Sequence, residues 1–478
     1  MDKMQFSSYI FMFVFLPVSV LGYYAAGKTG KYKNSQYFLL LVSIWFYAYA
    51  DIRYLPVLAA SILMNYLIFL LLKKYRMRKA LLAGAVILNL GVLFYFKYYN
   101  FFIDNANRFF GSDLSIKTLV LPLGISFMTF QQIAFIADTY HGKTADCSLA
   151  EYALFISFFP HIISGPIITC EEFVPMLRDK SRRNVNWDRL AAGMYLFAMG
   201  LGKKVLIADV LGRGVDYGYA SLAELNTTSA VFISVAYTLQ IYFDFSGYSD
   251  MATGISRMLN LDLPVNFNSP YQARTIVEFW DRWHITLTRF FTRYLYIPMG
   301  GSRKGEKRTW LHTMVVFLCS GFWHGASWTF VVWGFLHGLF LLLTKKAARI
   351  IERIPGWVNW CVTLLFVNAA WILFRAGSFG VFREMCKVLL ANDWGALHPE
   401  LCRLTRSFIW AWIPGFPDWA GALLYLFLSG IIVLKCKNAI QKAQDFDFSW
   451  HSGAFTVIIL ILSVLSFSNV STYIYANF

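Results

Sequence analysis

Two stretches of the chain gather polar and aromatic residues in arrangements suited to proton transfer. They run from Phe243 to His284 and from Ser320 to Gly338. The unperturbed pKa of histidine is near 6.5, so at neutral pH its imidazole can take a proton from an alcohol that attacks an acyl carbon. General-base help of this kind typically raises a rate about 10²–10⁴-fold. We therefore take His324 and His284 as candidate catalytic residues, and a thioester donor needs no metal for such a reaction.

His324 lies in an apolar part of the chain. No Asp, Glu, Lys or Arg occurs from Leu311 to Leu343, and an ionisable residue in a membrane segment is a candidate functional residue by default. Gly321 and Gly325 add little bulk beside it, so another group can approach closely. The alternative is a neutral histidine whose imidazole is satisfied by a carbonyl or hydroxyl group. His337 lies about 220° away around a continuous helix, which favours a packing role for it.

The segment around His284 has the periodicity of one helix, Glu278–Tyr294. Aromatic and apolar residues form one face of this helix, and arginines lie beside that face. His284 lies between the two sets of residues. This pattern is typical of a helix in the membrane interface, and a plain interfacial anchor is the alternative to a site. The face consists of Trp280, Trp283, Leu287, Phe290 and Tyr294, and the arginines are Arg282, Arg289 and Arg293.

Other candidate chemistries receive little support. Asp244 and Asp250 are about 240° apart on a helix, so they do not form an acid pair for glycosyl transfer unless Gly247 breaks the helix. The seven cysteines include no C-x-x-C and no metal spacing. Cys319 lies about 140° around a helix from His324, which argues against a Cys–His pair. We predict no metal site and no bound cofactor.

The composition requires these residues to be positioned by membrane helices. Of the 478 residues, 58% are hydrophobic and only 15% charged, and the net charge is +16. A disordered chain would be poor in apolar residues, and a membrane barrel would alternate apolar and polar residues. The sparse cysteines exclude a disulfide scaffold. The sequence therefore predicts an all-α polytopic membrane protein, and nothing in it points to nucleic acid.

Apolar runs recur along the whole chain without a long soluble domain, so we predict one membrane domain, residues 1–478. A helix needs about 20 residues to cross the bilayer, and several runs are shorter, so we expect about 10–13 membrane elements, some tilted or broken. The run Tyr152–Ile168 contains Pro160 and Pro166, which break helical hydrogen bonding. We read it as a re-entrant segment, with His161 as a candidate cavity-lining residue.

Basic clusters indicate which loops face the cytoplasm. Two apolar runs separate the clusters Lys28–Lys33 and Lys73–Lys79, which places the N-terminus outside. A cleaved signal peptide is the alternative for the first apolar run, and the many later runs favour a membrane helix. The remaining clusters lie at Arg178–Arg189, Arg303–Arg308, Lys345–Arg353 and Lys435–Lys442.

Six motifs occur in an order that resembles the membrane-bound O-acyltransferase (MBOAT) family. The resemblance is closest to the bacterial alginate and peptidoglycan O-acetyltransferase branch and is dense over residues 121–340. Two departures are Phe290–Arg293, where the branch usually has Trp-Phe-Arg-Asp, and the only partly matching tail Tyr473–Phe478. The motifs are Leu121–Phe127 with Thr129–Gln132, Phe159–His161 with Gly165-Pro166, Asp244–Ala252, Phe279–His284, Tyr294–Gly301 and Trp323–Ala326.

The resemblance implies a ring of tilted helices around a central tunnel, with His324 as catalytic base and His284 as the second histidine. It implies transfer of acetyl from a cytoplasmic donor, expected to be acetyl-CoA, toward an extracytoplasmic polysaccharide in the bacterial cytoplasmic membrane. The acceptor is reached directly or through a partner of the SGNH type. Substrate-binding candidates in the motif regions are Tyr271, Trp280, Arg282, Trp283, Trp323 and His161.

Two alternatives to acetyl transfer remain. A sister branch that moves D-alanine from a carrier protein to teichoic acid shares the motifs around His284 and His324, while the run Gly300–Gly305 and the long apolar tail favour the acetyl branch. A transporter or lipid flippase would be favoured by paired half-helices in two repeats, and we find no internal repeat. Membrane lipids are expected partners in every case.

Overall fold

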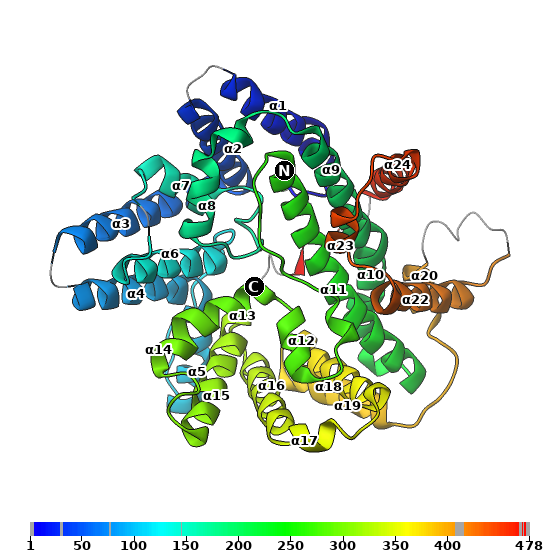
Figure 1. Cartoon of the computed structure of the whole chain (residues 1–478). Coiled ribbons are helices and arrows are strands. Elements are labelled where there is room, and N and C mark those ends of the chain that lie inside the picture. Colours follow the sequence, from blue (N-terminus) through cyan, green and yellow to red (C-terminus); the bar gives the residue numbers. More distant parts are fainter. Residues whose placement is uncertain are drawn as a thin grey trace. The chain divides into compact units, whose positions relative to one another are not determined.

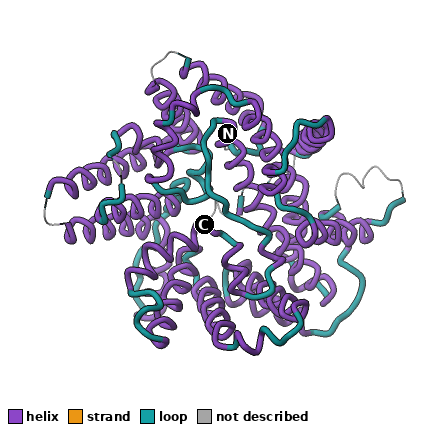
Figure 2. Tube along the Cα trace, in the orientation of Figure 1, coloured by secondary structure: helices purple, strands orange, loops and turns teal. Residues whose placement is uncertain are grey.

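The computed structural model describes residues 4–28, 32–75, 78–144, 146–406, 415–467, 471 and 473–474. Among these residues every regular element is a helix, and Figure 2 shows helices joined by loops without a strand. This confirms the predicted all-α class. The final residues 475–478 of the predicted tail and Lys31 of the first basic cluster lie outside the described residues.

The α-helices follow one another along the chain, joined by turns and by longer loops such as residues 111–124 between α5 and α6 (Figure 1). Some are extended by π-helical turns, such as Lys203–Ala208 between α9 and α10. Their bounds are α1 Leu16–Gly27, α2 Tyr32–Ala50, α3 Leu55–Lys74, α4 Arg78–Leu93, α5 Tyr99–Phe110, α6 Ile125–Tyr140, α7 Leu149–Ser157, α8 Cys170–Arg178, α9 Trp187–Gly202, α10 Asp209–Ala220, α11 Thr227–Met258, α12 Ile276–Arg282, α13 Ile285–Phe291, α14 Ile297–Met299, α15 Glu306–His324, α16 Trp328–Lys346, α17 Ala348–Ile351, α18 Gly356–Ala376, α19 Phe379–Leu390, α20 Pro399–Leu404, α22 Asp418–Lys435, α23 Ala439–Gln444 and α24 Trp450–Leu465.

Several of these helices are long and apolar enough to cross a membrane, so the protein is a multi-pass membrane protein. Two shorter apolar helices, Phe11–Gly27 and Trp450–Leu465, accompany them. The apolar run Leu119–Thr139 of the sequence is helical only from Ile125, where the 16-residue helix α6 begins. The count of about 10–13 membrane elements stays a prediction. In the described part of the chain, six helices are long and apolar enough to cross a membrane: Ile52–Lys74, Arg78–Phe110, Trp187–Ala220, Trp328–Lys346, Gly356–Ala376 and Asp418–Lys435.

Contacts divide the chain into two compact units. The first includes Met1–Phe197 and Tyr248–Pro264, and the second includes Ala198–Gly247 and Val265–Ile474. The long helices α9 and α11 contribute residues to both units. The prediction of one domain over the whole chain stays a prediction.

The first unit contains the predicted broken segment. Helix α7 ends at Ser157 and α8 begins at Cys170, and the backbone between them is buried and not helical. Two of its backbone groups bond to other parts of the unit: the Phe159 N–H donates to Ser43 Oγ at 3.2 Å, and the Pro160 carbonyl accepts from the Tyr248 hydroxyl at 3.1 Å. Irregular backbone of this kind survives at membrane depth only inside protein. The predicted break is thus confirmed.

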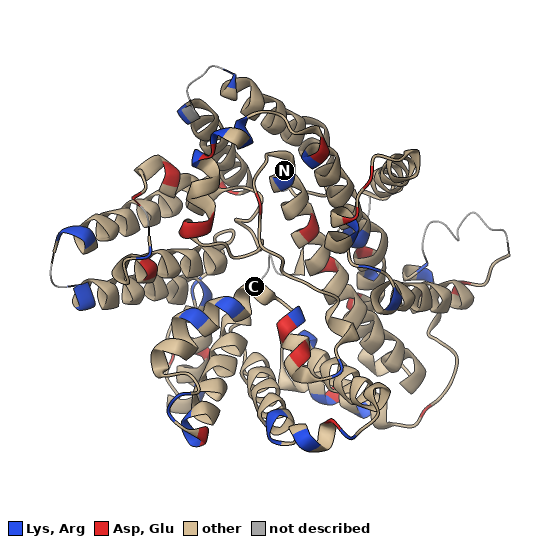
Figure 3. Ribbon diagram, viewed as in Figure 1, with Lys and Arg blue, Asp and Glu red and all other residues tan. Residues whose placement is uncertain are grey.

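The second unit is built around the α15–α16 hairpin, whose two helices are joined by Gly325–Ser327. The helices approach closely at glycines: a Cβ at Gly321 would overlap the Phe330 carbonyl oxygen, and one at Gly334 would overlap that of Phe317. The predicted close approach beside His324 therefore comes from α16. Figure 3 shows Lys and Arg gathered at the end of the hairpin opposite the turn.

Candidate active site

His284 does not lie within the continuous helix Glu278–Tyr294, so that prediction is wrong. Helix α12 ends at Arg282, α13 begins at Ile285, and His284 between them has φ 46° in the left-handed region. The break arises because a distant segment pairs with the linker: the Ile285 N–H donates to the Asn266 carbonyl at 3.0 Å. Left-handed non-glycine residues cost energy and are concentrated at functional sites.

Asn266 also fixes the hydrogen-bonding state of His284. Its Oδ1 accepts from the Thr286 N–H at 3.3 Å and from the Thr286 hydroxyl at 3.0 Å, which identifies that atom as the amide oxygen. The same oxygen lies 3.0 Å from His284 Nδ1. Because an amide oxygen can only accept, the neutral imidazole carries its proton on Nδ1. Nε2 therefore bears the lone pair that a proton acceptor needs.

His324 is the last residue of α15 and is buried in an aromatic enclosure. Its ring centroid lies 5.1 Å from that of Trp333 and 5.3 Å from that of Phe374, both nearly edge-on. Gly325 follows in an extended conformation, which turns the chain toward α16. The enclosure holds the imidazole on the inside of the hairpin, away from the basic ends of its helices.

Trp323 contacts both of the predicted catalytic histidines. Its ring centroid is 6.1 Å from that of His284 and 5.0 Å from that of His324. These contacts join a residue of the α12–α13 linker to the end of α15. Sequence spacing alone does not predict such a meeting, because 40 positions separate the two histidines.

His337 has the packing role that the sequence favoured. The angle of about 220° assumed one continuous helix from His324 to His337, but the helix is interrupted at Gly325–Ser327. Its ring lies 4.5 Å from that of Trp333, and its Nδ1 accepts from Trp280 Nε1 at 3.3 Å. The indole N–H of Trp280 can only donate a hydrogen bond, so Nδ1 of His337 accepts it with its lone pair. The neutral ring is therefore protonated at Nε2. His337 and His284 are thus held in opposite tautomers.

The other predicted binding residues lie in different surroundings. The Tyr271 hydroxyl donates to the Thr238 carbonyl at 2.7 Å and accepts from Trp371 Nε1 at 3.1 Å, so it holds neighbouring helices in place. Trp283 is buried and stacks on Phe279 with centroids 5.6 Å apart. Their binding roles stay predictions.

His161 belongs to the first unit and is fully buried in the broken segment. Its Nδ1 lies 3.3 Å from Gln131 Nε2, in the middle of α6. Because Gln131 is part of the T-F-Q-Q motif and His161 of the F-P-H motif, the contact joins two of the predicted family markers within one unit. Its role at a cavity stays a prediction.

An apolar cavity of about 280 Å³ lies among the elements that carry His284, His324 and His337. It extends along α15 from Thr313 to Ser320, one turn before His324, and has Lys345 and Asp281 in its lining. Trp280, the partner of His337, also lines it. We call it the apolar cavity; its lining is Val277, Trp280, Asp281, Leu287, Thr288, Phe291, Thr292, Tyr296, Thr313, Val316, Phe317, Ser320, Leu341 and Lys345.

The carboxylate of Asp244 forms a buried ion cluster that sequence reasoning missed. Lys204 Nζ lies 2.7 Å from Asp244 and 2.8 Å from Asp209, and all three side chains are buried. Ser471 donates to Asp209 at 2.6 Å and the Ile474 N–H to Asp244 at 2.9 Å, so the cluster also holds the end of the chain. A lysine within the apolar run Leu190–Val210 was the available signal. Helix α11 continues through Gly247, so Asp244 and Asp250 stay six residues apart on one continuous helix.

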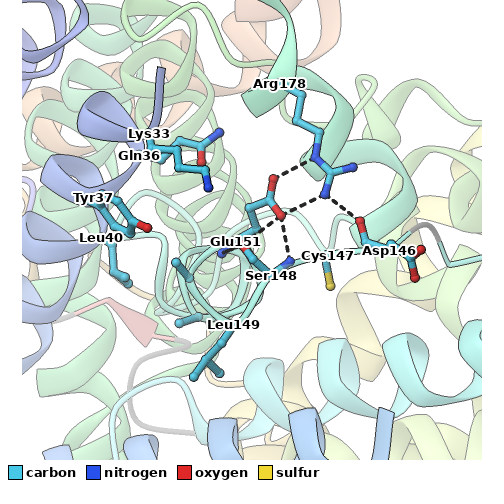
Figure 4. A pocket seen from close by; sticks show the side chains of 12 residues that line it. Lys33, Gln36, Tyr37, Leu40, Asp146, Cys147, Ser148, Leu149, Glu151 and Arg178 are labelled. Atoms are coloured by element: carbon cyan, nitrogen blue, oxygen red, sulfur yellow. Dashed lines mark hydrogen bonds and ion pairs between the residues drawn. The ribbon is translucent and has the colours of Figure 1, made fainter. Parts of the chain in front are cut away.

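The first unit has a separate cavity of about 790 Å³ between α2, α7 and α8 (Figure 4). In its lining Arg178 reaches the buried carboxylate of Glu151 at 2.7 Å, while Asp146 pairs with Lys73 outside it and Lys33 adds a further cation. Burial raises the pKa of Glu151, but hydrogen bonds from Arg178 and from the N-cap serine outweigh it and hold that pKa below its ordinary value. Each carboxylate of this α2–α7 cavity is therefore matched by a cation.

Comparisons with known proteins agree with the motifs. The family model of the membrane-bound O-acyltransferases matches residues 40–379. The peptidoglycan O-acetyltransferase of Helicobacter pylori is 35% identical, over 99% of this chain and 97% of that protein. The probable alginate O-acetylase AlgI of Pseudomonas aeruginosa is 37% identical, over 84% and 77%. The teichoic acid D-alanyltransferase of Bacillus subtilis is 26% identical, over 47% and 58%.

The family match covers most of the chain, and the two relatives named for O-acetylation align over 99% and 84% of it. The helical architecture and its membrane-length apolar helices agree with that match. The chain therefore belongs to the membrane-bound O-acyltransferase family, and it is an acyltransferase.

Proposed function

We propose that the protein is an O-acetyltransferase component that takes acetyl from cytoplasmic acetyl-CoA and passes it across the membrane to an extracytoplasmic polysaccharide. The observation that carries the proposal is the pair of buried histidines, His284 and His324, which share Trp323 and are carried by elements that line the apolar cavity. The acceptor is reached directly or through an extracytoplasmic partner of the SGNH type.

The identity of the acyl group rests on the relatives. Two named for O-acetylation of peptidoglycan and alginate cover at least 84% of this chain, while the D-alanyltransferase covers 47%. Transfer of D-alanine from a carrier protein is the weaker alternative. Membership of an acyltransferase family removes the reason to consider a transporter or flippase.

The proposed step uses the two imidazoles for different tasks. His324 takes the proton of the acceptor hydroxyl while the oxygen attacks the thioester carbonyl carbon, and the carbon–sulfur bond breaks to release the thiolate of CoA. The imidazolium then returns its proton to that thiolate. His284 accepts a hydrogen bond through Nε2 from a neighbouring hydroxyl of the acceptor and so orients the acceptor, because Asn266 keeps the imidazole proton on Nδ1.

The membrane orientation follows from the basic clusters. Arg303–Arg308 precedes α15 and Lys345–Arg353 follows the last turns of α16, so both ends of the hairpin are proposed to face the cytoplasm. The lining of the apolar cavity includes Lys345, in the last turn of α16, and Ser320, one turn before His324. A donor that enters from the cytoplasm would therefore extend toward His324, and the N-terminus of the chain would lie outside the bacterial cytoplasmic membrane.

The test is release of free CoA from acetyl-CoA by the purified protein in nanodiscs. Wild type is expected to turn over acetyl-CoA, and His324→Ala is expected to lose about 10²–10⁴-fold. His451→Ala is the matched control, because His451 is exposed at the start of α24 and far along the chain from the motifs. Wild-type turnover by a folded His324→Ala variant would refute the assignment of the base.

A parallel measurement separates the acyl groups. Wild type without turnover of acetyl-CoA, but with transfer of D-alanine from an acyl carrier protein, would favour the sister activity. Fusion of a reporter that is active only outside the cytoplasm to the N-terminus checks the orientation, and an inactive reporter there would contradict it.

A further inference from the structure

A second cavity in the same unit, of about 760 Å³, is mostly polar and strongly cationic. Three cations and one carboxylate line it, which leaves a formal charge of +2. The residues come from the segment before α12, from α12 itself, and from the facing ends of α18 and α22. We call it the cationic cavity; its lining is Gln272, Arg274, Glu278, Arg282, Trp360, Leu434 and Lys435.

The carboxylate in this cavity is already satisfied. Glu278 accepts from Arg282 Nη2 at 2.7 Å and from the Arg274 backbone N–H at 2.7 Å. Within the described residues neither the Arg274 guanidinium nor the Lys435 ammonium makes an ion pair. The Arg274 side chain instead lies against Gly356, where a Cβ would be 3.3 Å from its Nη1. Two charged donors are therefore available to an anion.

Helix α12 forms a wall between the cationic cavity and the apolar cavity. Glu278 and Arg282, four residues apart, lie on one face and line the cationic cavity, while Val277, Trp280 and Asp281 line the apolar cavity. An α-helix is about 10–12 Å across with its side chains. One elongated molecule with a polyanionic head and a slender uncharged arm matches the two environments.

The cationic cavity also contains an aromatic side chain held in a fixed position. Trp360 donates its Nε1 hydrogen to the Tyr271 carbonyl at 2.8 Å, and its indole lines the cavity. Indole faces stack with nucleobases, and arginine and lysine bind phosphate. The cavity lies at the start of α18 and the end of α22, both beside basic clusters expected to be cytoplasmic.

We propose that Arg274 and Lys435 bind the phosphates of the acyl donor's nucleotide, with Trp360 beside its adenine. This inference rests on the proposed function, because it takes a coenzyme A thioester as donor. The uncharged arm of the donor then passes α12 and places the thioester in the apolar cavity. The shared chemistry, phosphate recognition, also fits the headgroup of an anionic lipid, and the aromatic side chain favours the nucleotide.

The test compares donors with and without the nucleotide. In nanodiscs of neutral phosphatidylcholine, the double variant Arg274→Gln with Lys435→Gln is expected to raise KM for acetyl-CoA about 100-fold, roughly tenfold for each cation, with kcat unchanged. The KM of S-acetylpantetheine, which lacks the nucleotide, is expected to stay the same in wild type and variant. Lys33→Gln, in the α2–α7 cavity, is the matched control.

The outcomes separate this inference from the proposed function. An unchanged KM for acetyl-CoA, or an equal rise for both donors, would overturn the nucleotide site. A defect that appears only in nanodiscs with phosphatidylglycerol, and equally for both donors, would assign the cavity to lipid instead. If wild type does not turn over acetyl-CoA, equilibrium binding of CoA to wild type and double variant is measured instead. Loss of CoA binding in the double variant would support the nucleotide site, and unchanged binding would overturn it.

Discussion

Replacing Asn266 by Ala tests whether the structure holds His284 Nε2 ready to accept a hydrogen bond from the acceptor. The substitution removes the one oxygen that three donors share: His284 Nδ1 at 3.0 Å, the Thr286 N–H at 3.3 Å and the Thr286 hydroxyl at 3.0 Å. Without that oxygen the imidazole loses the contact that keeps its proton on Nδ1. The left-handed backbone at His284 also loses one of its side-chain supports.

The size of the effect follows from the hydrogen bonds lost. A hydrogen bond of about 1 kcal/mol sets a ratio of about fivefold between the two tautomers. Loss of alignment adds about the same factor, so kcat/KM for acetyl transfer should fall about 25-fold in Asn266→Ala. The two donors of Thr286 also stay buried without their acceptor, at a cost of about 1–3 kcal/mol each in stability.

Two further variants separate alignment from stability. Thr286→Ala removes a donor to the same oxygen but leaves the imidazole contact, so it should lower the melting temperature and leave kcat/KM within about twofold. Asn266→Asp keeps an acceptor beside Nδ1 and adds a negative charge, which raises the pKa of His284. The acidic limb of its pH–rate profile should therefore move to higher pH.

The assay is release of CoA in nanodiscs, with the folded fraction of each variant measured by size-exclusion chromatography. Wild-type kcat/KM in folded Asn266→Ala would refute the role of the amide oxygen. An unshifted acidic limb in Asn266→Asp would show that the protonation of His284 does not control the rate.

Three further predictions follow from other parts of the structure. Lys204→Met leaves two buried aspartates without their cation and should cost about 3–5 kcal/mol of stability; melting in detergent checks this, with the adjacent Lys203→Met as control. Gly321→Ala should separate the α15–α16 hairpin and abolish activity, whereas Gly430→Ala in α22, with open space around its Cβ, should keep activity and melting temperature. The lowered pKa of Glu151 means that its contribution to stability is present above about pH 4.5 and is lost as the pH falls through the folded-state pKa. Glu151→Gln should therefore lower the melting temperature at pH 7 and flatten its decline in acid, and an unchanged melting curve would contradict this.

Local patterns in the sequence were sufficient for the class of protein and for the candidate histidines. The apolar composition and the length of each apolar run can be read from local sequence alone. They predicted membrane helices, and the structure contains helices that are long and apolar enough to cross a membrane. Proline breaks helical hydrogen bonding wherever it occurs in a chain, so the break after Ser157 was predictable from the sequence. The motifs around His284 and His324 likewise required no tertiary information to identify a membrane acyltransferase.

The tertiary structure decided which residues meet. Asn266 breaks the predicted helix at His284 from 18 positions away, and Lys204 joins Asp244 across 40 positions. The cationic cavity brings Arg274 together with Lys435, which lies at the far end of α22. Such meetings depend on how helices pack, and helical periodicity shows only which face of one helix is apolar. The sequence alone therefore determined the membrane class and the chemistry of the candidate histidines, whereas packing between distant segments determined the tautomer of His284, the surroundings of both histidines and the cavities beside them.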